Sequence, residues 1–264
     1  MTPSATFLWS VVGAALGTAL PLGLLLWWRR THRAKWTPFF VGALVFVVFA
    51  LVLEPLAHRF FLLGDHAVAR AIGANPYLYM LYGGLAAGVF EETGRFVAFR
   101  FLLTKRRFPE RTTAVAYGIG HGGVEALLLH AAPYLLCAVL AIYQSRGNAP
   151  AALALAGGNA EALAALYATL AALTPGAVLL GLLERAGAML LHVALSCFVF
   201  LAARDRTQRA WFPFAIALHA IADMPAALCQ RGLLPLGAVE LWLWVVALFA
   251  LLSARKCYLE AMDP

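Results

Sequence analysis

Long apolar segments separated by short polar connectors dominate the pattern of this chain. A membrane-spanning helix needs about 20 mostly apolar residues, and the segments that meet this requirement span residues 5–27, 37–56, 77–103, 113–142, 176–202, 210–230 and 235–253. Helices satisfy all their backbone hydrogen bonds internally, as the hydrocarbon core demands. The pattern therefore predicts an all-α fold, a polytopic transmembrane helical bundle of about seven spans.

Two connectors are long enough to hold secondary structure of their own. Residues 58–76 interleave charged and apolar side chains, which is typical of an amphipathic helix at the membrane surface. Residues 144–175 are rich in alanine, nearly uncharged and interrupted by glycines such as Gly157 and by Pro175. We expect an interfacial helix in the first segment, and in the second we expect short helices on the outer side rather than another span.

The composition excludes a soluble globular protein. Hydrophobic residues make up 63% of the chain and charged residues only 12%, and mean hydropathy is +0.81. A soluble fold of this length would expose far more apolar side chain than water tolerates. We expect residues 1–264 to form a single integral membrane domain, a multi-pass protein surrounded by lipid in the cell membrane.

Basic residues concentrate in alternate connectors, which predicts the topology. The cation-rich side holds Arg29, Arg30, Arg33, Lys35, Lys105, Arg106, Arg107, Arg111, Arg204, Arg206, Arg209, Arg255 and Lys256, and the opposite connectors hold only Arg59, Arg70, Arg146 and Arg231. By the positive-inside rule the N-terminus is outside and the C-terminus is cytoplasmic. A nucleic-acid partner is not expected, because no basic stripe with aromatic residues stands outside the membrane.

Several ionisable side chains fall inside the predicted spans. Each charge at mid-membrane costs about 2.5 to 3.5 kcal/mol on insertion scales, so these groups are expected to face one another inside the bundle. On each of four spans, two of them lie four or eight residues apart and hence on one helix face. The pairs are Glu91 and Arg95, His121 and Glu125, Glu184 and His192, and His219 and Asp223.

Depth allows these pairs to meet. With a rise of 1.5 Å per residue, Glu91, His121, His192 and His219 fall within roughly 10 Å of one level in the cytoplasmic half of the membrane. The neighbouring carboxylates, Glu92 among them, outnumber the arginines, so the cluster needs protons or a metal cation to balance its charge. We expect one polar cluster around a water-filled pocket.

Two kinds of chemistry suit such a cluster. The three histidines His121, His192 and His219 together with Glu91 match the ligand count of a catalytic zinc ion that keeps one position for water. Without a metal, a glutamate and a histidine could activate the same water as general bases. The spacing leaves both mechanisms open.

At these residues the chain resembles the YhfC family of intramembrane proteases, within the larger superfamily of CAAX prenyl endopeptidases and bacteriocin-processing membrane enzymes. The resemblance covers about residues 77–225 and rests on paired glutamates with a following arginine, an aromatic-x-x-x-His motif and a His-x-x-x-Asp motif. These look like Glu91, Glu92 and Arg95, then Tyr117 and His121, then His219 and Asp223. Two departures are the EExxR spacing and the tyrosine where phenylalanine is usual.

The resemblance implies an endopeptidase that acts on a membrane-associated protein or peptide in the bacterial cytoplasmic membrane. Glu91 and His121 would activate the attacking water. His219 and Asp223 would stabilise the oxyanion or complete a metal site. The residues in supporting positions are Glu92, Arg95, Glu125, Glu184 and His192.

Other functions remain open from the sequence. Intramembrane glutamates and histidines also form proton relays, so a proton- or ion-coupled transporter is an alternative. A non-catalytic scaffold in which the cluster only holds helices together is another. We interpret Glu54 and Glu240 as residues near span ends that reach the interface, Trp242 as part of an aromatic belt, and His130 as structural because it is out of phase with His121.

Overall fold

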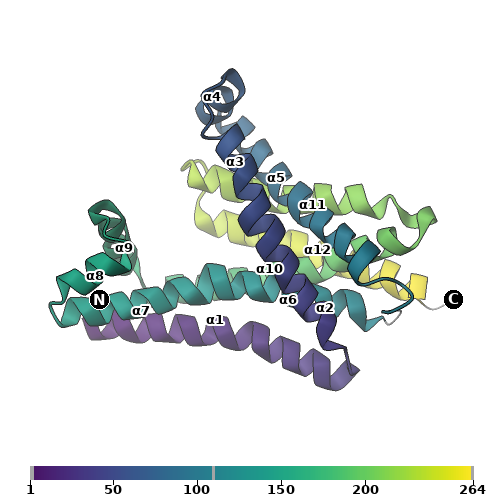
Figure 1. The fold of residues 1–264 in the computed structure, drawn as a ribbon, viewed down its shortest axis with the longest axis horizontal. Coiled ribbons are helices and arrows are strands. Elements are labelled where there is room, and N and C mark those ends of the chain that lie inside the picture. Colours follow the sequence, from purple (N-terminus) through teal and green to yellow (C-terminus); the bar gives the residue numbers. More distant parts are fainter. Residues whose placement is uncertain (1–2, 109–110, 263–264) are drawn as a thin grey trace. The chain divides into compact units, whose positions relative to one another are not determined.

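The computed structural model describes residues 3–108 and 111–262, and the regular secondary structure of these residues is helical throughout. The all-α fold is thus confirmed (Figure 1). The α-helices are α1 (Pro3–His32), α2 (Trp36–Val48), α3 (Glu54–Phe61), α4 (Ala67–Ala74), α5 (Pro76–Val97), α6 (Thr112–Ala126), α7 (Ala132–Ser145), α8 (Ala149–Leu155), α9 (Ala160–Ala172), α10 (Pro175–Arg204), α11 (Trp211–Gln230) and α12 (Leu236–Met262).

Short turns of other helix types join some of these helices. The π-helical turns η1 (Phe49–Leu53), η2 (Ala98–Leu102) and η3 (Leu127–Ala131) each contain five residues, and η4 (Arg206–Gln208) is a 3₁₀ turn. A π-turn inserts one extra residue into a helix without ending it. As a result, α2 continues through η1 into α3, and α6 continues through η3 into α7.

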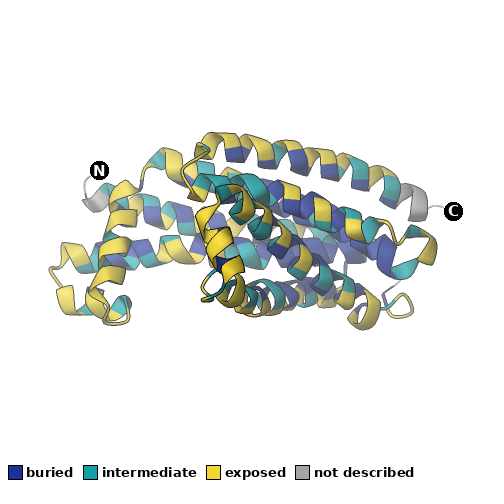
Figure 2. Cartoon of the chain, turned by 90° about the horizontal axis from the view of Figure 1, so that it is seen from above, coloured by how far each residue is buried: buried dark blue, intermediate teal, exposed yellow. Residues whose placement is uncertain are grey.

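The chain divides into two compact units. One comprises residues 1–23 and 125–186, and the other comprises residues 24–124 and 187–264. In the first unit, Cys137 and Leu140 of α7 and Leu170 of α9 are buried in one apolar cluster. In the second, Leu195 and Phe198 of α10 lie in a larger apolar core. Around most helices buried and exposed residues alternate (Figure 2), which suits helices that face protein on one side and lipid on the other.

Six helical segments of the described residues are long and apolar enough to cross a membrane. They are Ala5–His32, Trp36–Phe61, Thr112–Ser145, Pro175–Arg204, Arg206–Gln230 and Leu236–Tyr258. Each coincides with one of the predicted spans, and each is longer than predicted by a few residues at one end or both. The chain is therefore a polytopic membrane protein.

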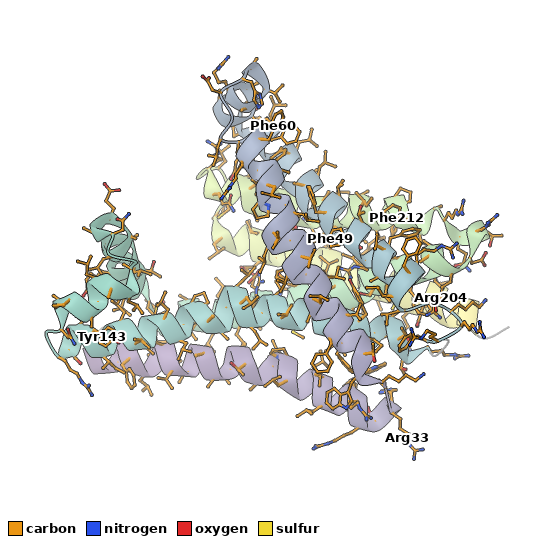
Figure 3. The ribbon with its side chains drawn as sticks, in the orientation of Figure 1. Arg33, Phe49, Phe60, Tyr143, Arg204 and Phe212 are labelled. Atoms are coloured by element: carbon orange, nitrogen blue, oxygen red, sulfur yellow. The ribbon has the colours of Figure 1, made fainter. Side chains whose placement is uncertain are left out.

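The remaining predicted span, residues 77–103, is the helix α5 with its extension η2. Its 22-residue α-helical part is about 33 Å long at 1.5 Å per residue, which is enough to span the hydrocarbon core. Its glutamates and arginine lower its hydropathy, and α5 is not among the six segments above. It packs between two of them: Phe49 of η1 (Figure 3) meets Gly94, and α11 meets Gly84 and Gly88.

The prediction of a single interfacial helix over residues 58–76 is wrong. Residues 58–61 complete the second membrane span, and a turn separates them from the short helix α4. His66 caps α4 by accepting the backbone N–H of Ala69, and Asn75 caps α5 by accepting the N–H groups of Tyr77 and Leu78. These side chains satisfy the first backbone N–H groups of α4 and α5 and so determine where each helix starts.

Residues 144–175 form two short helices, as expected. The helices α8 and α9 meet at a bend of 98° and together are apolar enough to count as one broken span. Gly157 and Gly158 lie at the bend with φ of 66° and 78°. Backbones with positive φ favour glycine because it has no Cβ.

Two basic side chains of the second unit, Arg204 and Lys35, hold the loop that precedes α6. Arg204 (Figure 3) donates to the carbonyl oxygens of Leu103 and Phe108 and lies 3.6 Å from the centroid of the Phe200 ring. Lys35 donates to the carbonyl of Arg107 at 3.3 Å. Two side chains far apart in the sequence thus bind the backbone of one connector.

Candidate active site

The predicted cluster forms within the second unit, where glycines allow its helices to approach closely. A Cβ on Gly118 of α6 would lie 2.6 Å from Cα of Val193 in α10, and a Cβ on Gly120 would collide with the carbonyl oxygen of Phe39 in α2. On α5, a Cβ on Gly88 would lie 2.6 Å from the carbonyl oxygen of Ile216 in α11. Small residues at helix crossings are typical of membrane bundles, and here they bring the polar side chains of different helices within hydrogen-bonding distance.

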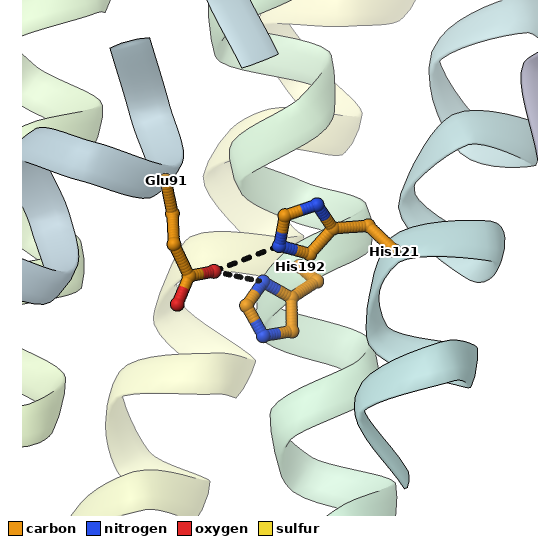
Figure 4. A group of neighbouring side chains, drawn as sticks. All are labelled: Glu91, His121 and His192. Carbon is orange, nitrogen blue, oxygen red and sulfur yellow. Dashed lines mark hydrogen bonds and ion pairs between the residues drawn. The ribbon is translucent and has the colours of Figure 1, made fainter. Parts of the chain in front are cut away.

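Glu91 lies beside two histidines (Figure 4). Its Oε2 is 2.7 Å from Nε2 of His121 and 4.0 Å from Nδ1 of His192. The three side chains come from α5, α6 and α10, and their residues are 7%, 0% and 3% exposed. This is the meeting of helices that the depth argument predicts.

These three residues fit a divalent metal ion. One potential ligand atom from each lies within 4.8 Å of those of the other two. Two ligands about 2.1 Å from a tetrahedral zinc ion are about 3.4 Å apart, and the separations of 2.7 Å and 4.0 Å lie on either side of that value. A carboxylate and two imidazoles are also ligand types that zinc prefers.

Arg95 neutralises the second glutamate of the pair. Its Nε lies 3.0 Å from Oε2 of Glu92, and neither side chain is exposed. Its Nη1 donates at 2.6 Å both to Oγ of Ser196 and to the carbonyl oxygen of His192. Its Nη2 lies 3.1 Å from Nδ1 of His192. Because arginine only donates hydrogen bonds, Nδ1 carries the lone pair and the proton of the neutral ring is on Nε2.

His219 connects Glu92 to the more exposed Asp223. Its Nδ1 is 2.7 Å from Oε1 of Glu92, and its Nε2 is 3.3 Å from Oδ2 of Asp223, whose side chain is 39% exposed. Only the doubly protonated ring has an N–H on both nitrogens. His219 is therefore placed to hold positive charge between two carboxylates, and its ring centroid lies 5.5 Å from that of His192.

Three of the four side chains expected to bind a metal lie together in the structure. The group that could hold a metal among the described residues consists of Glu91, His121 and His192. His219, expected as the fourth ligand, contacts Glu92 and Asp223, and its role as a metal ligand stays a prediction. Sequence spacing places a residue on a helix face, but it does not decide which of two adjacent glutamates a histidine meets.

Glu125 and Glu184 belong to the first unit and share Arg185. Nη1 of Arg185 lies 2.7 Å from Oε1 of Glu125, and its Nη2 binds Glu184. Their predicted supporting role in the cluster stays a prediction. His130 lies in the same unit, where its ring packs against Tyr134 with centroids 4.7 Å apart, in agreement with a structural role.

A further buried carboxylate was missed by the sequence argument. Glu54 is only 9% exposed, so the interpretation that it reaches the interface is wrong. Its Oε1 lies 3.3 Å from Nε2 of His58, whose Nδ1 is 2.8 Å from the hydroxyl of Tyr82. The carboxyl of Glu54 is also within electrostatic range of Glu91 and Asp223. The spacing of Glu54 and His58, four residues apart, was the available signal. Glu240 is likewise buried, at 8% exposure.

The fold and this site together define a class: a multi-pass α-helical membrane protein with a glutamate and two histidines converging inside its helices. Residues 16–246 match the sequence model of a family described as YhfC intramembrane metalloprotease, and the chain belongs to this family. It is also 34% identical over 243 residues to an uncharacterized membrane protein YhfC of Bacillus subtilis (strain 168). The matched region covers 92% of this chain and 91% of the relative. No solved structure matches the chain.

Proposed function

We propose that this chain is an intramembrane endopeptidase that hydrolyses a peptide bond of a membrane-associated protein or peptide. The observation that carries the proposal is the position of the Glu91 carboxylate, buried and 2.7 Å from the His121 ring with His192 beside it. The description of its family as intramembrane metalloproteases supports the same reaction. Burying an ionisable cluster of this kind in a membrane costs free energy, so such clusters are rare where they serve no function.

Glu91, His121 and His192 would hold the metal, and zinc is the ion that suits these ligands. When bound, such an ion polarises a carbonyl group and makes a water molecule more acidic. Binding through Nδ1 of His192 would compete with the hydrogen bond from Arg95 to the same lone pair. In a metal-free version of the mechanism, Glu91 and His121 would take the proton of the attacking water themselves.

The other residues of the cluster would orient and stabilise. Nδ1 of His219 is engaged with Glu92, so its Nε2–H would leave Oδ2 of Asp223, 3.3 Å away, and donate to the oxygen that becomes negative when water adds to the carbonyl. A donor of this kind is worth about 3 to 4 kcal/mol in the transition state. Arg95 would keep Glu92 ionised and His192 in one tautomer. Asp223 is the member of the cluster with the most exposed side chain, at 39%, so a substrate would reach the site on that side.

Elemental analysis and a cleavage assay test the proposal together. Purified wild-type protein is expected to contain about one zinc ion per chain and to cleave a labelled transmembrane peptide in liposomes. The Glu91→Gln variant is expected to lose the metal and the activity. Glu161→Gln on α9, at an exposed position, is the matched control and should retain both.

Each remaining outcome has a defined meaning. Full activity in Glu91→Gln would overturn the assignment of Glu91. Cleavage without zinc that still depends on Glu91 would establish the metal-free mechanism. Proton flux in proteoliposomes that depends on Glu91, without proteolysis, would support a transporter instead. Substrates that co-purify with the Glu91→Gln variant would identify the natural target.

A further inference from the structure

The helix that carries His219 and Asp223 lacks one of its own hydrogen bonds. Pro225 lies inside α11, and a proline has no backbone N–H to donate to the carbonyl four residues earlier. That carbonyl belongs to Ile221, in the turn between the two site residues. Inside a bilayer, where no water can substitute, an unpaired carbonyl is strongly unfavourable.

A side chain from the next helix donates a hydrogen bond to this carbonyl. The indole Nε1–H of Trp242, on α12, donates to the carbonyl oxygen of Ile221 at 2.8 Å. Trp242 as a whole residue is 40% exposed, while the one donor of its side chain is bound to α11. The bond replaces the one that Pro225 removes and ties α12 to the turn between His219 and Asp223.

The position of that turn matters for the geometry of the site. On one side, α11 is fixed by its close approach to α5, where a Cβ on Gly84 would lie 2.5 Å from the carbonyl oxygen of Ala220. The residue after Ala220 is Ile221, whose carbonyl is held by Trp242. Without the second bond, the proline would let the helix move at this turn, and the 3.3 Å contact between His219 and Asp223 would lengthen.

We propose that Trp242 is a positioning residue for His219 and Asp223, because its indole supplies from α12 the hydrogen bond that Pro225 removes from α11. This inference rests on the proposed function, because its activity measurements require that the protein cleaves peptides. Trp242 does not touch the reacting atoms. Its contribution is to hold His219 and Asp223 at the relative position that their 3.3 Å contact requires.

Four variants separate the hydrogen bond from the bulk of the ring. Trp242→Phe keeps an aromatic ring and removes the N–H. Pro225→Ala restores the backbone N–H that can reach Ile221, and the double variant combines both changes. Trp244→Phe is the matched control, because this neighbouring ring packs on Gly187 instead.

Steady-state cleavage of a transmembrane peptide is the first measurement. We expect Trp242→Phe to lower kcat about tenfold, equivalent to about 1.4 kcal/mol of activation free energy, with KM unchanged. The double variant should return to within about threefold of Pro225→Ala, and Trp244→Phe should match wild type. A double variant as slow as Trp242→Phe would overturn the proposal, because the loss would then come from packing.

A second measurement does not depend on proteolysis. In protein labelled with ¹⁵N-histidine, the ring signals of His219 should shift in Trp242→Phe and return in the double variant, while Trp244→Phe leaves them unchanged. Unshifted His219 signals in Trp242→Phe would overturn the positioning role even if stability falls. If wild type cleaves nothing, the proposed function fails, and the His219 signals alone decide whether Trp242 positions this turn.

Discussion

Nε of Arg95 lies 3.0 Å from Oε2 of Glu92, three residues earlier on α5, and both side chains are fully enclosed. Removing one partner of such a pair leaves a buried charge uncompensated, at a cost of about 3 to 5 kcal/mol. We predict that Arg95→Met lowers the free energy of unfolding by this amount in detergent. Arg95→Met combined with Glu92→Gln should lose much less.

Denaturant unfolding followed by circular dichroism measures both variants. Arg146→Met is the control, because Arg146 is exposed after α7 and its replacement should change stability by less than about 0.5 kcal/mol. Equal losses in the single and double variants would show that the charge pair is not what Arg95 contributes.

Two equally enclosed histidines should differ in their effect on metal binding. His121 is 0% exposed and His130 is 5% exposed, but only His121 lies in the group that fits a metal. We predict that His121→Ala weakens zinc affinity more than about 100-fold, since losing a group that merely orients a ligand already costs 10- to 100-fold. Competition against a fluorescent chelator measures the affinity. His130→Ala should retain wild-type affinity, and similar losses in both would argue against the Glu91, His121 and His192 site.

The glycines at helix crossings should tolerate no side chain. A Cβ on Gly42 would collide with the carbonyl oxygen of Tyr117, and one on Gly120 with that of Phe39. Backbone atoms cannot move aside as a flexible side chain can, so Gly120→Ala should cost at least the 1 to 3 kcal/mol typical of overpacking. Thermal unfolding in detergent measures the change. Gly237→Ala is the control, because nothing lies within 4 Å of its added Cβ. If both substitutions cost the same, close packing of α2 against α6 is not required.

The topology is also open to test. From the distribution of arginine and lysine we predict an outer N-terminus and a cytoplasmic C-terminus. A phosphatase active only outside the cytoplasm, fused after residue 264, should be inactive, and a fluorescent protein at the same place should fold. The same reporters fused after Arg146 should give the reverse result. An active phosphatase at the C-terminus would contradict the predicted orientation.

Much of the fold follows from the sequence because the bilayer sets simple requirements. Apolar length alone identifies the six spans, including α12. The segment 77–103 was expected as a span despite Glu91 and Glu92, and the helix α5 is present there. The π-turns could not be predicted, since the five residues of η1 are as apolar as their neighbours and carry no signal for an extra residue.

The helix faces that form the cluster could be predicted from the sequence, but the pairing of individual side chains could not. Periodicity places Glu91 on the face that meets His121, and the structure brings them together. Which carboxylate Arg95 would pair with was not predictable, because Glu91 and Glu92 precede it by four and three residues, about one turn in both cases. Glu54 was missed since the second span was expected to end at residue 56, whereas the helix continues to Phe61.

The extra residue of η1 determines where the end of the second span points. Glu54 follows Phe49–Leu53 directly, and one residue corresponds to about 100° of rotation around a helix. If all five residues were wound as a regular α-helix, the carboxylate of Glu54 and the ring of His58 would be turned about a quarter turn away from Tyr82. Deleting any one of them would close the bulge into a regular α-helix and keep both side chains on their present face. A single-codon gap at this place in a homologue would therefore be compatible with an unchanged interior, whereas the same gap elsewhere in the span would rotate everything that follows it.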